Sequence, residues 1–90
     1  MRMDILIVED QRRIAEGLSV MLSSCKEDGI QIERTLIADN GVQALKMLEQ
    51  QPVDLLITDI RMPIMDGLEL MRRCSVQHRD VPFIILSGYD

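Results

Sequence analysis

Three apolar segments of this chain end in polar residues that could carry chemistry. Glu9 and Asp10 follow the first segment, Asp59 follows the third, and Ser87 follows the last. If these segments are neighbouring parallel strands, their carboxyl ends meet at one edge of a sheet. Open α/β sheets bind their ligands in the crevice outside that edge. We therefore expect these side chains to form one site.

Three carboxylates in one place repel one another unless one takes up a proton or a cation lies among them. Oxygen ligands suit a hard ion such as Mg²⁺, which typically binds one or two carboxylates, a carbonyl and water beside a phosphate group. A carboxylate next to Mg²⁺ can attack phosphorus, because the metal neutralises the incoming phosphoryl oxygens. Ser87 could donate a hydrogen bond to one of those oxygens.

Each of these residues also has an ordinary structural interpretation. Asp59 could be a loop acid or a helix cap, Glu9 and Asp10 could cap the helix that follows them, and Ser87 could cap another. For Asp59 taken alone, the structural interpretation is the better one. The coincidence of such residues at three strand ends favours a functional site.

Strands and helices are predicted to alternate along the whole chain. The predicted strands cover residues 4–8, 32–38, 53–58 and 81–86, and the predicted helices cover 11–25, 42–51 and 67 to about 77. Alternation at these lengths implies right-handed crossovers, a parallel sheet and helices on both of its faces. The second strand is more polar than the first, so we expect it at a sheet edge.

The spacing of apolar residues predicts which face of each helix is buried. The predicted inner faces are Ile14, Leu18, Met21, Leu22 and Cys25 in the first helix, Val42, Leu45 and Leu48 in the second, and Leu68 and Met71 with Cys74 or Ser75 in the third. The cysteines have no CxxC or Cys/His spacing, so both are interpreted as small core hydrophobes in a reducing compartment.

Length and composition limit the function further. Ninety residues make one domain at most, and 47% hydrophobic with 28% charged residues is a globular composition. A net charge of −5 and only 2% aromatic residues argue against direct binding to nucleic acid or to an anionic membrane. No apolar run has the length of a membrane span and no signal peptide precedes the first strand, so we expect a cytoplasmic location.

Three segments together resemble the receiver domain of bacterial two-component response regulators. They are VEDQ at 8–11, TDIRMPIMDG at 58–67 and PFIILSG at 82–88, and they match that family in order, spacing and surroundings. The acidic pair, the D-x-x-M-P-x-M-D-G run and a strand ending in Ser or Thr form a specific combination. The amino-acid sequence of these segments looks most like that of receivers joined to an AraC-type DNA-binding domain, the YesN-like group.

The resemblance implies a flavodoxin-like fold with strand order 2-1-3-4-5, and it implies a role for each site residue. Asp59 matches the phosphoacceptor, Asp10 the acid that binds Mg²⁺ directly, and Glu9 the acid that acts mostly through water. Arg61 would lend its backbone carbonyl to the metal, which completes the expected ligand set. Ser87 matches the hydroxyl residue that turns towards the phosphoryl group. The phosphoryl group would come from a sensor histidine kinase.

Receivers continue through a fourth helix, a fifth strand that carries a lysine and a fifth helix, and none of these is found in this sequence. No lysine follows Lys46. We therefore interpret residues 1–90 as a C-terminally truncated receiver domain, with strand order 2-1-3-4. Strand 81–86 would then be an apolar edge, so we predict self-association through it. An output domain that binds DNA and regulates transcription is expected outside this chain.

Three functions are compared on these residues. The preferred one is a signalling domain that is phosphorylated at Asp59 and turns over no separate substrate, so it is not an enzyme. The second is a receiver fragment that carries no phosphate and acts only in folding or oligomerisation, which the absent lysine makes plausible. The third is a Mg²⁺-dependent phosphatase with an aspartyl-phosphate intermediate. Such enzymes use a second Asp, two residues after the nucleophile, as the acid/base, and this chain has Arg61 at that position.

Overall fold

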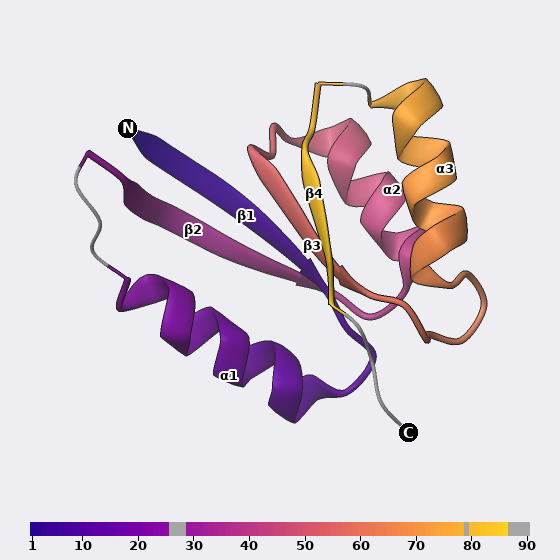
Figure 1. Cartoon of the computed structure of the whole chain (residues 1–90), viewed down its shortest axis with the longest axis horizontal. Coiled ribbons are helices and arrows are strands. Elements are labelled where there is room, and N and C mark those ends of the chain that lie inside the picture. Colours follow the sequence, from indigo (N-terminus) through magenta and orange to yellow (C-terminus); the bar gives the residue numbers. More distant parts are fainter. Residues whose placement is uncertain (26–28, 79, 87–90) are drawn as a thin grey trace.

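The computed structural model describes residues 1–25, 29–78 and 80–86 (Figure 1). Within these residues, strands and helices alternate as the sequence predicted. Their bounds are β1 (Arg2–Val8), α1 (Arg12–Ser23), β2 (Gln31–Ala38), α2 (Gly41–Gln50), β3 (Leu55–Asp59), α3 (Gly67–Gln77) and β4 (Phe83–Leu86).

The sheet is parallel, and in the described residues its strand order is β2-β1-β3-β4. This confirms the predicted parallel α/β fold and the edge position of β2. Val8 pairs with Ala38 on one side and with Thr58 on the other, while Asp59 pairs with Leu86. The register therefore brings the carboxyl ends of the strands together at one edge of the sheet.

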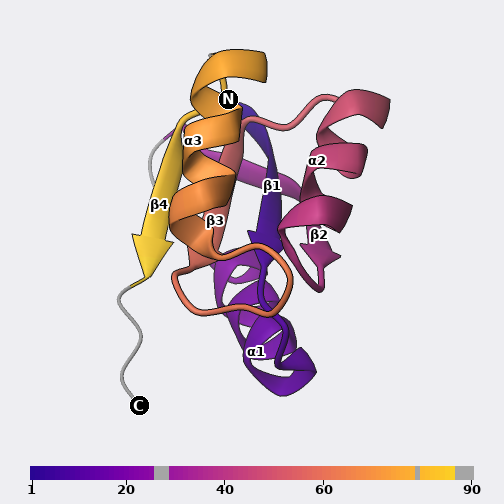
Figure 2. The same cartoon turned by 90° about the vertical axis from the view of Figure 1, so that its right-hand side faces the viewer.

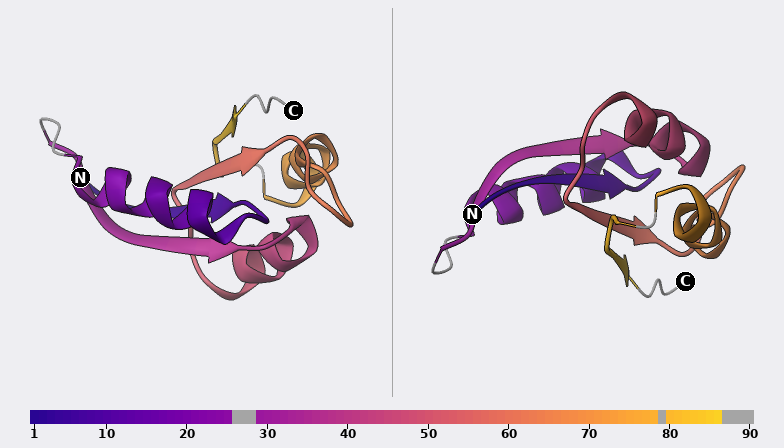
Figure 3. Two further views of the ribbon diagram at one scale, coloured as in Figure 1. Left: turned by 90° about the horizontal axis from the view of Figure 1, so that it is seen from below. Right: turned by 90° about the horizontal axis from the view of Figure 1, so that it is seen from above.

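Helices cover both faces of the sheet. Along β1, Ile5 and Ile7 pack with Ala15 of α1, while Leu6 and Val8 pack in the core that α2 and α3 close. Helices α2 and α3 lie together at the end of the molecule away from the N-terminus, and α1 runs along β1 and β2 (Figures 1 and 3). In Figure 2, which looks onto that end, α2 and α3 lie in front of the sheet. Burial on both faces explains why β1 is apolar along most of its length rather than alternating.

The predicted inner face of α1 is partly wrong. Ala15 is its fully buried residue and Leu18 and Leu22 are half-buried, but Ile14 and Met21 are 45% and 69% exposed. Cys25 is exposed as well, so it is not the core hydrophobe that its spacing suggested. The apolar stripe of α1 is wider than the contact that the helix makes with the sheet. The small side chain of Ala15 faces the sheet, and the larger residues beside it point to solvent.

The predicted inner faces of α2 and α3 are also wrong in the first turn of each helix. Val42 is 37% exposed and Leu68 is 51% exposed. Each follows a buried glycine, Gly41 or Gly67, which is the first residue of its helix. Because consecutive helical residues point about 100° apart, burial of the glycine turns the next side chain outward.

Further along, α2 is buried at Ala44 and Leu48, and α3 is buried at Leu70 and Cys74. Leu45 and Met71 are half-buried. Leu48 and Cys74 are therefore predicted core residues that the structure bears out, whereas Ala44 and Leu70 were not predicted.

Strand β4 lies at an edge of the sheet in the part of the chain that is described. It begins at Phe83, two residues later than predicted, and its Ile84 is 48% exposed. Strand β3 is displaced along the chain relative to the prediction and takes in Asp59 as its last residue. No helix among the described residues is long and apolar enough to span a membrane.

Substitutions at Ala15 and Met21 test the orientation of α1. Ala15→Leu should lower the free energy of unfolding by about 1–3 kcal/mol, because the added methylene groups have no space against the sheet. Met21→Lys should change it by less than about 0.5 kcal/mol, since that side chain is exposed. Urea unfolding followed by far-UV circular dichroism measures both. A larger loss for Met21→Lys than for Ala15→Leu would contradict the observed orientation.

Candidate acidic site at the carboxyl edge of the sheet

The ends of β1 and β3 bring three carboxylates together. One carboxylate oxygen from each of Glu9, Asp10 and Asp59 lies within 4.8 Å of the other two. Glu9 is only 3% exposed, Asp59 is half-buried and Asp10 is exposed. The pairing of Val8 with Thr58 produces this arrangement, because Glu9, which follows β1, and Asp59, which ends β3, then stand side by side.

Local hydrogen bonds orient two of these acids. Glu9 Oε2 accepts from the backbone N–H of Gln11 at 3.1 Å, and the Glu9 N–H donates to the carbonyl of Ala38 at 3.0 Å. Asp59 Oδ1 accepts from the backbone N–H of Ile60 at 2.8 Å. The carboxylates of Glu9 and Asp59 are thus oriented by backbone N–H groups one or two residues along the chain, and the backbone of Glu9 is held against the end of β2.

Burial raises the pKa of Glu9 above its usual value, and the nearby carboxylates of Asp10 and Asp59 raise it further. The hydrogen bond from Gln11 opposes this shift of the Glu9 pKa. A charged carboxylate is disfavoured by the low dielectric of a buried position and by a like charge nearby, and Glu9 experiences both. A divalent cation among these oxygens would relieve that penalty. The oxygen donors of Glu9, Asp10 and Asp59 therefore fit a hard ion such as Mg²⁺.

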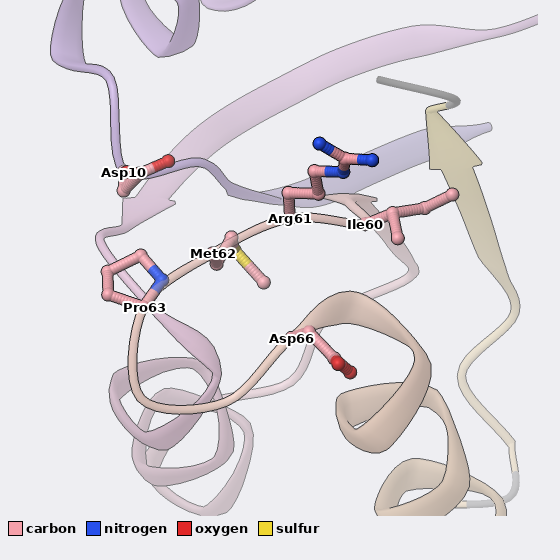
Figure 4. Close-up of a pocket in the computed structure, with 6 residues that line it drawn as sticks. All are labelled: Asp10, Ile60, Arg61, Met62, Pro63 and Asp66. Atoms are coloured by element: carbon pink, nitrogen blue, oxygen red, sulfur yellow. The ribbon is translucent and has the colours of Figure 1, made fainter. Parts of the chain in front are cut away.

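The loop from β3 to α3 forms the wall of an open pocket beside these acids. The pocket is lined by Asp10, Ile60, Arg61, Met62, Pro63 and Asp66 (Figure 4). Arg61, Met62 and Pro63 follow one another along the segment that leaves β3, Asp66 lies on the returning part of the loop, and Asp10 lies on the segment that follows β1. Arg61 thus lines the same pocket as Asp10. The use of its carbonyl as a metal ligand stays a prediction.

This loop is compact because several contacts close it. The N–H of Gly67 donates to the carbonyl of Ile60 at 2.7 Å, and the N–H of Met65 donates to the carbonyl of Pro63 at 2.7 Å. Asp66 caps α3 by accepting from the N–H of Glu69 at 2.8 Å. The burial of Met65, which is 7% exposed, was not predicted, although its place in the M-P-x-M-D-G run was a signal for it.

Ser87 lies outside the described residues, so its predicted role is untested. The described residue before it, Leu86, pairs with Asp59 in the parallel register. The end of β4 is therefore the neighbour of the end of β3.

The comparisons with known proteins agree with this geometry. The family model of the response regulator receiver domain matches residues 5–90. The response regulator MprA of Mycobacterium avium (strain 104) is 36% identical over 88 residues, which are 98% of this chain and 36% of that protein. The chain thus spans about a third of the length of the curated relatives that it matches.

Solved structures are similar over nearly the whole chain. The response regulator TrrA of Thermotoga maritima, in complex with Mg²⁺ and BeF, is 35% identical with a TM-score of 0.79, and the match covers 98% of this chain and 71% of that one. A two-component transcriptional regulator, AraC, from Clostridium phytofermentans is 32% identical with a TM-score of 0.83, covering 98% of this chain and 68% of that one.

The loop contains a strained residue whose replacement should stabilise the chain. Ile64 has φ 72° and is 81% exposed, so it adopts a left-handed conformation without packing that requires isoleucine. This conformation costs a branched residue about 1–2 kcal/mol, whereas Asn tolerates it. Ile64→Asn should raise the free energy of unfolding by about 0.5–1 kcal/mol in urea titrations. Ile64→Val keeps the branched side chain and should leave it unchanged; equal stability of both variants would contradict the strain.

Removing one acid should stabilise the chain when Mg²⁺ is absent. Asp59→Asn should raise the free energy of unfolding at neutral pH by about 1 kcal/mol, the size of a like-charge interaction across about 4 Å of water. Because the folded-state pKa of Glu9 is raised, its favourable contribution is present at acid pH and is lost as pH rises through that pKa. The gain from Asp59→Asn should therefore shrink as pH falls.

Urea unfolding with EDTA, across pH, measures this effect, and the same titration with Mg²⁺ should stabilise the wild-type chain more than Asp59→Asn. Glu49→Gln is the matched control, because it removes the same charge from an exposed position on α2. An equal gain from both substitutions would show that net charge, and not the acidic site, is responsible.

Proposed function

The chain belongs to the family of response regulator receiver domains, and from this premise we propose that Asp59 accepts a phosphoryl group in the presence of Mg²⁺. The observation that carries the proposal is the approach of Glu9, Asp10 and Asp59 oxygens to within 4.8 Å of one another. This arrangement supplies a nucleophile and a set of metal ligands at one place. Mg²⁺ would neutralise charge on the incoming phosphoryl group.

The protein's own residues would then divide the work. Asp59 is the nucleophile: a carboxylate oxygen attacks phosphorus, a P–O bond forms, and the P–N bond of the donor phosphohistidine breaks. The N–H of Ile60 fixes the Asp59 carboxylate by its hydrogen bond to Oδ1. Glu9 and Asp10 would hold the metal, with Glu9 acting from the buried side. The Arg61 carbonyl is proposed as a further metal ligand, and Ser87 as the hydrogen-bond donor to the phosphoryl group.

The partners follow from the family. Receiver domains are signalling domains, and we propose that a sensor histidine kinase supplies the phosphoryl group and that an output domain elsewhere in the whole protein reads the result. The similarity to a transcriptional regulator named AraC supports a DNA-binding output. The Mg²⁺ in the TrrA complex supports the same ion here. Self-association through the edge strand β4, with its exposed Ile84, stays a prediction.

Phosphoryl transfer can be measured by intact mass after incubation with Mg²⁺ and a small phosphodonor such as acetyl phosphate. The wild-type chain should gain one phosphoryl group only when Mg²⁺ is present, and Asp59→Asn should gain none. Asp10→Asn should react at least about tenfold more slowly, the effect expected when a group that fixes the reacting geometry is lost. Asp54→Asn removes an acid from the connection before β3 and should react as the wild type does.

Other outcomes would favour the other two functions. If the wild-type chain binds Mg²⁺ but gains no phosphoryl group, a receiver that carries no phosphate is the better description. If the chain releases inorganic phosphate from a phosphate monoester such as p-nitrophenyl phosphate, over many turnovers per chain, the phosphatase interpretation is the better one. A phosphoryl group found on Asp59→Asn would contradict Asp59 as the acceptor.

A further inference from the structure

Gly67, the first residue of α3, lies directly against the backbone of Asp59. A Cβ atom at this position would lie 2.1 Å from the carbonyl oxygen of Asp59, 3.0 Å from its carbonyl carbon and 3.1 Å from the Cα atom of Ile60. These are backbone atoms, which cannot rotate away as the end of a side chain can. Any side chain at position 67 must therefore displace either α3 or the backbone of Asp59, the candidate nucleophile.

Gly41, the first residue of α2, leaves space for the side chain of Met65, which belongs to the loop between β3 and α3. A Cβ atom there would lie 2.8 Å from Sδ, 2.9 Å from Cγ and 3.0 Å from Cβ of Met65. Met65 is buried in the same core cluster as Val8 and Ala38, the last residues of β1 and β2. The loop is thus attached to α2 through Met65 and to β3 through Gly67.

We propose that Gly67 and Gly41 are positioning residues for the acidic site. Gly67 allows the C-terminal end of the 60–66 loop to lie against the backbone of Asp59, and Gly41 leaves room for Met65 of the same loop against α2. This sets the distance of the Asp59 carboxylate from Asp10. The inference rests on the proposed Mg²⁺ and phosphoryl chemistry, and it adds two residues that touch neither ligand.

The short covalent path from these contacts to the site explains how they act. The Asp59 carbonyl that Gly67 touches is bonded to the same Cα atom that bears the reactive side chain. A Cβ atom 2.1 Å from that carbonyl oxygen is far inside van der Waals contact, and where the carbonyl shifts to relieve the contact, the carboxylate moves relative to Asp10. A misplacement of about 1 Å in a catalytic site can reduce a rate by about a hundredfold. The contact at Gly41 is softer, because the Met65 side chain can change rotamer.

Alanine substitutions at these two positions, with Gly17→Ala as the matched control, test the proposal. Gly17 is a helical glycine in α1 whose added Cβ would meet no atom within 4 Å. The dissociation constant for Mg²⁺ is measured by isothermal titration calorimetry on each variant, after urea unfolding has established its folded fraction. The chemical shift of the Ile60 amide and the phosphorylation rate at saturating Mg²⁺ are recorded beside it.

Gly67→Ala should weaken Mg²⁺ binding at least about tenfold and shift the Ile60 amide, because the backbone of Asp59 has moved. Gly41→Ala should weaken Mg²⁺ binding about threefold, as the softer contact requires. Gly17→Ala should bind as the wild type does. A purely structural role would lower the stability of the variants but leave the Mg²⁺ affinity of the folded molecules unchanged.

Folded Gly67→Ala and Gly41→Ala variants that bind Mg²⁺ as tightly as the wild type would overturn the proposal. If Gly67→Ala does not fold, Gly41→Ala decides by the same criterion. Failure of the proposed function is a separate result: a wild-type chain that binds Mg²⁺ without gaining a phosphoryl group leaves the affinity comparison valid. A wild-type chain that binds no Mg²⁺ overturns both.

Discussion

Repulsion among the carboxylates of Glu9, Asp10 and Asp59 is the constraint around which this structure is arranged. The parallel pairing of β1 with β3 brings their carboxyl ends together, so the sheet fixes the backbone positions from which Glu9 and Asp59 project. Burial of Glu9 increases the cost, as the direction of its pKa shift shows. Strained or unfavourable groups persist only where the surrounding structure holds them. The apolar core on both faces of β1 supplies that support.

The loop after β3 extends this support to the solvent side of the site. Its closure by Gly67, the burial of Met65 and the cap made by Asp66 fix a segment that would otherwise be free to move. Helices α2 and α3 therefore hold the loop in place through these contacts, in addition to packing on the sheet. The same elements that bury the core hold the candidate nucleophile, so stability and function depend on common contacts.

The sequence was sufficient for the order of the elements, the parallel sheet and the edge position of β2, because alternation of strands and helices allows few topologies. It was insufficient for the rotation of α1, where Ile14 and Met21 share the apolar stripe with the buried Ala15. Periodicity identifies an apolar stripe, but only packing decides which part of it touches the sheet. The close approach of Gly67 to Asp59 was also missed, because a glycine after Asp is an ordinary sign of a turn or cap.

The burial of the acids falls off in one direction: Glu9 is inside, Asp59 is half-buried and Asp10 is open to water. The acidic site therefore has one side exposed to solvent and one side covered by protein. Among the described residues, an incoming group meets Asp10 and the pocket rim first, while the side of Glu9 is closed by protein. For the proposed phosphoryl transfer, a donor would therefore approach the site from the side of Asp10 and not from the side of Glu9.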